Sequence, residues 1–185
     1  MRLPLVFAAI AVIAASVARS APPGSAAPPE AGLLAGTWTL DPARSTELSP
    51  WKTLDLTLQV NGNQVTLQRR FGWGRRAYSE EMTFVVEPQE TVVPLPYWPD
   101  NRHLGAYAGG DQTKRVKATW LDDGRLLRLS SDLVLDTQQG PREVNCLSDY
   151  RISANGSLLT VIELRSTRNR PVVYVFTRTP APPKS

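Results

Sequence analysis

The sequence has very little of what metal and catalytic sites are usually built from. Its 185 residues include a single cysteine, Cys146, and a single histidine, His103. A lone cysteine excludes an intramolecular disulfide, so the hydrophobic core has to stabilise the fold unaided. One histidine and one cysteine are also too few for a zinc site, which usually takes about three or four such ligands. We therefore expect neither a metal site nor a cofactor.

A recognisable catalytic arrangement is missing as well. A serine or cysteine nucleophile would have to pair with His103, which lies in a loop-like stretch. Cys146 stands in the middle of a strand-like run, which is typical of a small core residue rather than a reactive thiolate. The carboxylates are scattered, although the residues alone leave a paired-carboxylate glycosidase open. We expect no catalytic residues and predict that the protein is not an enzyme.

Long apolar runs are absent after residue 20. Before it, Arg2 precedes the uncharged apolar run 3–18, and the small residues Ala18 and Ser20 precede Ala21. This order is typical of a secretory signal peptide with its cleavage site. The alternative is a membrane anchor, but the run is short for a bilayer span, which needs about 20 apolar residues. We predict a signal peptide at 1–20, export to the periplasm or the medium, and no stable membrane span.

Composition divides the rest of the chain. Residues 21–32 are rich in proline and alanine and predict a linker, and residues 180–185 predict a disordered tail. The folded domain is then 33–179. The net charge of +4 falls by two when Arg2 and Arg19 leave with the signal peptide. So mild an imbalance does not require a nucleic-acid partner, and the sequence does not indicate an oligomeric state.

Alternation of apolar and polar residues is what the domain has in abundance. In 53–60, Leu54, Leu56 and Leu58 fall on one face of a strand, and Asn61-Gly62 then predicts a tight hairpin. No ten-residue window shows a helical stripe with caps. Further strands are predicted at 65–71, 78–86, 91–95, 114–120, 125–135, 143–152, 158–165 and 172–178. The fold class is all-β, a single antiparallel up-and-down β-barrel of about eight to ten strands.

The predicted connections sort into two sets. If 91–95 counts as a strand, alternate connections fall at opposite ends of the meander. One end receives the short connections 61–62, 87–90, 121–124 and 153–157. The other end receives 42–52, 72–76, 96–112, 136–142 and 167–170, most of which are longer. Such sorting predicts a barrel with one closed and one open end.

The opening of the domain carries a family resemblance. Gly36-Thr37-Trp38, followed by Leu40-Asp41 and Ser45, resembles the first strand of small exported bacterial lipocalin-like proteins, which are calycin-type β-barrels. The resemblance implies that Trp38 plugs the closed end and that Arg178, on the last strand, packs over it through a cation–π contact. It also implies binding of a small apolar molecule. The usual lipocalin cysteine pair is absent, and ten strands would be closer to fatty-acid-binding proteins.

Two stretches stand out as candidates for ligand contact. Residues 69–76, RRFGWGRR, interleave four arginines with aromatic rings and suit either a solvated hairpin tip or a basic rim for an anionic group. Export argues against the nucleic-acid reading of this pattern. Residues 96–112 form the longest stretch without periodicity, which favours either a binding loop or a loop whose aromatics fill the barrel mouth. The two stretches supply Trp73, Tyr97, Trp98, His103 and Tyr107.

Arg69 poses a separate question because it is in phase with Val65 and Leu67 and should point inward. A lone buried guanidinium is costly. Three explanations are open: a ligand anion, an internal carboxylate such as Glu80, or a bulge that turns Arg69 outward. The functional hypothesis is a small apolar or amphipathic, anionic ligand bound by Arg69 and the five residues above. The alternative is a cell-envelope interaction or structural domain with a filled barrel; a cavity of about 300 Å³ or more would favour the binder.

Overall fold

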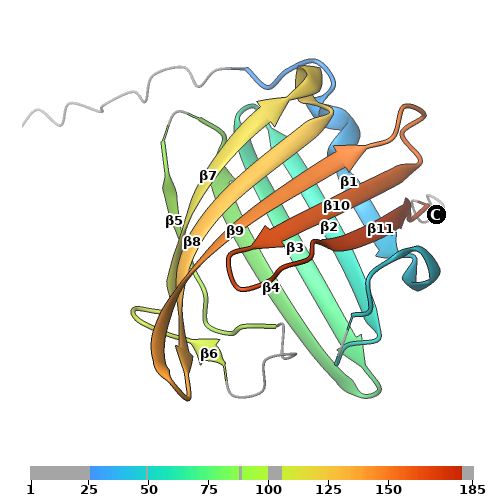
Figure 1. Cartoon of the computed structure of the whole chain (residues 1–185). Coiled ribbons are helices and arrows are strands. Elements are labelled where there is room, and N and C mark those ends of the chain that lie inside the picture. The colour runs from blue at the N-terminus through green and yellow to red at the C-terminus, as the bar shows by residue number, and fades with distance from the viewer. Residues whose placement is uncertain (1–25, 49, 88, 100–105, 181–185) are drawn as a thin grey trace, which may run out of the picture.

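In a computed structural model of the chain, the structure describes residues 26–48, 50–87, 89–99 and 106–180 (Figure 1). The predicted signal peptide, residues 21–25 of the predicted linker, residues 181–185 of the predicted tail and His103 lie outside the described residues. Within the described parts, no helix is long and apolar enough to cross a membrane.

The fold is an antiparallel meander that curls into a barrel (Figure 1). The hydrogen-bonded order is β4-β3-β2-β1-β11-β10-β9-β8-β7-β5, so sequence neighbours are mostly spatial neighbours. These ten strands form a nearly closed up-and-down barrel, which confirms the predicted fold class. The strands are β1 (Gly36–Leu40), β2 (Thr53–Asn61), β3 (Gln64–Trp73), β4 (Arg76–Val85), β5 (Thr91–Pro94), β6 (Tyr107–Ala108), β7 (Thr113–Leu121), β8 (Leu126–Thr137), β9 (Gly140–Ile152), β10 (Leu158–Arg165) and β11 (Val172–Arg178).

Two details differ from the sequence expectation. The stretch 96–112 was expected to lack structure, but its residues Tyr107 and Ala108 form β6, which pairs with β8. Short 3-10 turns also occur at η1 (Ala31–Leu34), η2 (Pro42–Arg44) and η3 (Asp122–Gly124). Two to four residues cannot display a period, so such elements leave no signal in the pattern of the sequence.

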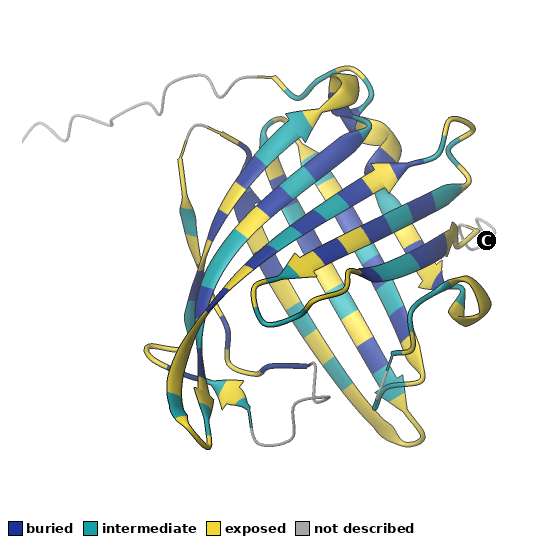
Figure 2. Cartoon of the chain, in the orientation of Figure 1, coloured by how far each residue is buried: buried dark blue, intermediate teal, exposed yellow. Residues whose placement is uncertain are grey.

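Alternation places the core inside the barrel. Leu54, Leu56 and Leu58 of β2 are 3% exposed or less, and on the paired strand β3 the buried Leu67 lies opposite Leu58. The same alternation runs along most strands as bands of buried and exposed residues (Figure 2). A second buried cluster lies at the loop after β5 and contains Leu95, Trp98, Leu133, Leu135, Val144 and Cys146.

One end of the barrel is closed around Trp38, which has no solvent exposure. Its indole Nε1 donates to the carbonyl oxygen of Leu34 in η1 at 3.0 Å. The guanidinium carbon of Arg178 lies 4.1 Å from the Trp38 ring centroid, and its Nη1 donates to the Ala35 carbonyl at 2.8 Å. Gly36 has φ +131°, and a Cβ there would lie 2.7 Å from Arg178 Nη1. A side chain at this position would therefore collide with the arginine that covers the ring.

The barrel seam lies between β4 and the β5–β7 pair. Among the described residues, backbone contact across it comes from a parallel bridge between Val86 and Ala118 and from the Glu87 amide, which donates to the Ala118 carbonyl at 3.1 Å. The Val85 amide also donates to the Thr91 hydroxyl at 3.3 Å. Among the described residues no ladder joins β4 to β5. The seam is therefore the weakest join in the wall.

Candidate functional site

Five charged side chains point into the barrel and form what we call the lumenal charge layer. Its members are Arg69 of β3, Glu80 of β4, Lys114 of β7, and Glu163 and Arg165 of β10. Each occupies an inward position because side chains alternate along its strand. Fully or nearly buried charges are rare unless they are paired. The layer is therefore the most unusual feature of the interior.

Arg69 and Glu80 form the first pair of the layer. They stand opposite each other in the β3–β4 register, and both Nε and Nη2 of Arg69 contact Glu80 Oε1. Of the three explanations for an inward Arg69, the internal carboxylate is the one that the structure shows. Burial alone raises the pKa of Glu80, but the charges of Arg69 and Lys114 outweigh burial and hold that pKa below its usual value. Glu80 is thus ionised at neutral pH.

Glu163 and Arg165 form the second pair. The Arg165 Nε donates to Glu163 Oε1. The side chain of Arg165 is 8% exposed and that of Glu163 is 11% exposed. The guanidinium of Arg165 also lies 4.9 Å from the ring centroid of Trp98, a distance that suits a cation–π contact. The Ser148 hydroxyl lies 3.5 Å from the other Glu163 oxygen. Arg165 is consequently held between a carboxylate and an aromatic face.

Lys114 differs from the two arginines. It is 8% exposed, and no hydrogen bond or ion pair joins it to another described residue. Burial lowers the pKa of its ammonium group, the charge of Arg69 lowers it further, and the carboxylates of Glu80 and Glu163 act in the opposite direction. The net pKa lies below the ordinary lysine value.

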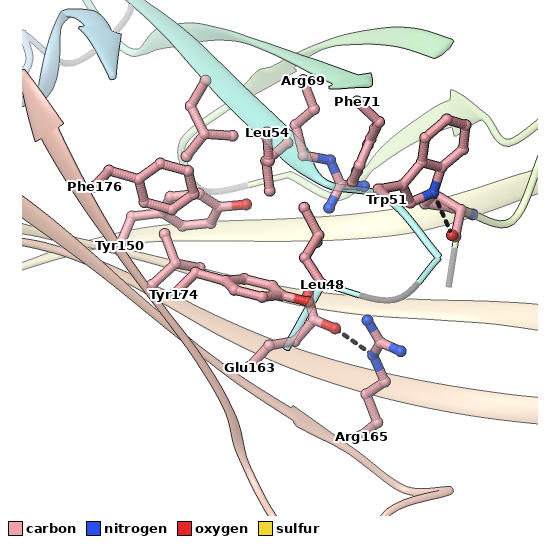
Figure 3. Close-up of a pocket in the computed structure, with 13 residues that line it drawn as sticks. Leu48, Trp51, Leu54, Arg69, Phe71, Tyr150, Glu163, Arg165, Tyr174 and Phe176 are labelled. Atoms are coloured by element: carbon pink, nitrogen blue, oxygen red, sulfur yellow. Dashed lines mark hydrogen bonds and ion pairs between the residues drawn. The ribbon is translucent and has the colours of Figure 1, made fainter. Parts of the chain in front are cut away.

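Two small cavities meet the charge layer. One, of about 40 Å³, lies toward the mouth and is mainly apolar (Figure 3). In Figure 3, Arg69 reaches in from β3 while Glu163 and Arg165 lie on the facing strand. The second, of about 50 Å³, contacts Lys114. Both are lined by Arg69, Pro99, Tyr150, Glu163 and Arg165. The layer is thus part of the wall of both a mainly apolar cavity and a more polar one.

Aromatic rings gather at the apolar cavity, which Trp51 and Phe71 line. Trp51 packs against Phe71 with ring centroids 5.6 Å apart, and Tyr78 packs against Tyr97 at 4.7 Å. The Trp51 Nε1 donates to the Pro99 carbonyl at 2.9 Å, which ties the β1–β2 connection to the loop after β5. Part of the cavity lining, Leu48, Trp51 and Pro99, therefore comes from the connections between strands rather than from the strands themselves.

The structure brings some of the predicted ligand contacts together and leaves others apart. Arg69 and Trp98 line the cavities, and Tyr97 lies beside Tyr78 at their edge while remaining 38% exposed. Trp73 is 46% exposed at the β3–β4 turn, where Arg76 stacks on it with 5.6 Å between guanidinium and ring centroid. Tyr107 is 68% exposed on β6. Both belong to segments that extend past the barrel wall, so neither lines either lumenal cavity.

Sequence reasoning missed Lys114, Glu163 and Arg165. The signal was present: Lys114 is in phase with the inward Val116, and Glu163 is in phase with the inward Val161. Arg165 follows Glu163 in the same phase. A search for charged residues in phase with inward apolar residues, which singled out Arg69, would have found all three.

Metal or thiol chemistry has little support at this site. Among the described residues no three His, Cys, Asp or Glu side chains gather to hold a metal ion. Burial, followed by the charge of Glu163, raises the pKa of the Cys146 thiol to about 11. The thiol is therefore protonated at neutral pH and poorly reactive.

Comparison with known proteins supports the architecture. The sequence matches no family model and no curated protein. Among solved structures, the REP1-NXSQ fatty acid transporter is 11% identical and matches 80% of this chain and 98% of its own, with a TM-score of 0.50. The Schistosoma mansoni fatty acid binding protein in complex with arachidonic acid is 9% identical and matches 82% and 99%, also with a TM-score of 0.50. Likeness at this identity shows the fold alone, an antiparallel up-and-down β-barrel. A bacterial origin and export stay predictions.

Proposed function

We propose that this barrel is a non-catalytic, exported binding protein for a small amphipathic molecule with an anionic head. The head lies at the lumenal charge layer, and the apolar part lies in the cavity beneath Trp51. The observation that carries the proposal is the juxtaposition of buried charges and an apolar chamber. The names of the two structural neighbours, a fatty acid transporter and a fatty acid binding protein, agree with this ligand class.

The charge layer argues for a ligand because it is expensive as a purely structural device. Removing an ion from water costs several kcal/mol even after relaxation, and well-packed apolar residues often stabilise a core as well or better. Among the described residues the layer has three basic side chains, Arg69, Lys114 and Arg165, and two carboxylates, Glu80 and Glu163. An anionic ligand would complement this excess of basic side chains.

The size of the cavities sets a condition on binding. At about 40 and 50 Å³ they are far smaller than the roughly 300–1,000 Å³ of ordinary ligand pockets. An alkyl chain must therefore displace side chains. Leu48, Trp51 and Pro99 line the apolar cavity from connecting segments, so they are the residues that a chain would displace at least cost.

Cavity volume favours a second candidate, an interaction or structural domain of the cell envelope whose barrel is filled by its own side chains. Larger hollows occur elsewhere: one of about 410 Å³ lies on the outer face of the sheet, where Arg115, Asp132 and Asn145 line it. It mixes both signs of charge and holds no buried ionic layer. Volume alone thus points to the filled barrel, while the lumenal charges point to a ligand.

Titration with dodecanoate, followed by tryptophan fluorescence and calorimetry, separates the two candidates. The binding proposal expects saturable binding of about one equivalent and a fluorescence change that Trp51→Phe removes. Trp73→Phe is the matched control, because Trp73 lies outside the cavities, and it should keep the change. Absence of saturable binding for medium-chain and long-chain carboxylates would favour the filled barrel.

A further inference from the structure

We infer that Lys114, rather than Arg69, binds the anionic head of the ligand, and that the preferred head is a monoanion such as a carboxylate. The inference rests on the proposed function and adds to it the anchoring residue and the charge of the ligand. It also differs from the expectation that the sequence raised, which placed Arg69 in this role.

The two arginines of the layer already have partners. Glu80 contacts two nitrogens of Arg69. Arg165 donates to Glu163 and stacks on Trp98. A ligand carboxylate that bound either arginine would have to compete with a carboxylate that is covalently part of the barrel and positioned by a paired strand. Such an exchange gains little, because one buried ion pair is replaced by another and the displaced glutamate is left unpaired.

Lys114 has no such partner. No hydrogen bond or ion pair joins it to another described residue, and the charges of Glu80 and Glu163 act on it without direct contact. Lys114 is 8% exposed and lines the cavity of about 50 Å³. Ser131 and Ser148 line the same cavity, so a head group bound there would also meet hydroxyl groups. A buried ammonium with no hydrogen-bonded anion is unfavourable. A ligand carboxylate beside Lys114 would form a charge-assisted hydrogen bond where none exists now.

The charges around Lys114 limit the head to one negative charge. Within the described residues the layer has three basic side chains against two carboxylates, and the charges of Glu80 on β4 and Glu163 on β10 both act on Lys114. A monoanion balances that excess. A phosphate monoester carries about −1.5 to −2 charges at neutral pH and would add repulsion from both glutamates. The site should therefore select alkyl carboxylates over alkyl phosphates of equal chain length.

The test compares Lys114→Met with Lys117→Met. Both lysines lie on β7, but Lys117 points outward and its side chain is 70% exposed. Methionine keeps the length and apolar stem and removes the charge. The ligands are dodecanoate, dodecyl phosphate and the neutral 1-dodecanol. Calorimetry should show dodecanoate binding about ten- to a hundredfold weaker in Lys114→Met, as expected for loss of a hydrogen bond to a charged group. Lys114→Met should bind 1-dodecanol as tightly as wild type does. Lys117→Met should match wild type in its affinity for both dodecanoate and 1-dodecanol.

Failure of the inference is distinguishable from failure of the proposed function. If Lys114→Met binds dodecanoate as tightly as wild type, Lys114 is not the anchor, although the barrel is still a binding protein. If wild type binds dodecyl phosphate as tightly as dodecanoate, the monoanion preference is wrong. If wild type binds none of the three ligands, both the proposed function and the inference fail.

A measurement on the wild-type protein covers the case in which Lys114→Met does not fold. The side-chain NMR signals of Lys114 should shift when dodecanoate is added and remain in place when 1-dodecanol is added. Equal shifts with the two ligands, or none with dodecanoate while calorimetry shows binding, would overturn the assignment of Lys114.

Discussion

Trp38 and Arg178 show how a short motif acts at the scale of single residues. The indole is fully buried, and Arg178 both covers it and donates to the carbonyls of Leu33 and Ala35. The pair therefore links the first strand, the last strand and η1.

The first prediction is that Trp38→Ala lowers the free energy of unfolding by about 3–5 kcal/mol, the usual cost of deleting a buried tryptophan. Urea unfolding followed by circular dichroism measures this difference. Trp73→Ala is the control: its ring is 46% exposed, and its unfolding free energy should remain within about 0.5 kcal/mol of wild type. An unchanged midpoint for Trp38→Ala would mean that the ring does not support the closed end.

The second prediction concerns Glu80. Its folded-state pKa is lowered from 4.5, with burial opposing and the charge of Arg69 dominating the shift. A depressed carboxylate pKa stabilises the fold above the unfolded pKa, and this contribution is lost as the pH falls through the folded pKa. Glu80→Gln should therefore cost about 3–5 kcal/mol at pH 7, the range for breaking a buried pair. The difference in unfolding free energy between Glu80→Gln and wild type should shrink below about pH 4.5.

Glu81→Gln is the matched control for this experiment, because Glu81 lies next to Glu80 but faces outward and is exposed. Its unfolding free energy should follow the wild-type pH profile. A Glu80→Gln deficit that stays constant between pH 7 and pH 3 would show that the ionised carboxylate is not what stabilises the fold.

At the scale of elements, the strands were predictable where the alternation was long. The expected strands 53–60 and 114–120 correspond to Thr53–Asn61 and Thr113–Leu121. Period two specifies which face of a strand is buried, and a buried face in turn specifies the register. The same pattern contains no information on which strand lies beside which, so the missing ladder between β4 and β5 could not be predicted.

The third prediction is that this seam opens first. The Val86–Ala118 bridge joins β4 to the β5–β7 pair, whereas β8 and β9 share a ladder from Leu126–Arg151 to Thr137–Gly140. Elements with few backbone contacts open at lower free energy than long ladders. Hydrogen exchange followed by NMR should show lower protection for amides of β4 and β5 than for those of the central part of β8 and β9. Equal protection across the four strands would contradict a weak seam.

At the scale of the whole molecule, the candidate site was predictable only in part. The inward direction of Arg69 follows from its own strand, but the identity of its partner depends on the register of two strands. Cavity volume depends on how many side chains pack together, which no local pattern encodes. The crowding of the lumen by residues such as Leu56, Phe84 and Phe176 therefore became apparent only from the fold.

The last prediction concerns the route of the whole chain to its compartment. Arg2, the apolar run 3–18, and small residues at 18 and 20 have the order that is typical of a secretory signal peptide, and we propose that 1–20 is one. Exported protein should therefore begin at Ala21, which intact mass spectrometry and N-terminal sequencing would show. Ser20→Arg should block processing, because cleavage requires a small residue immediately before the cut. Exported wild-type protein that retains Met1 would contradict the prediction.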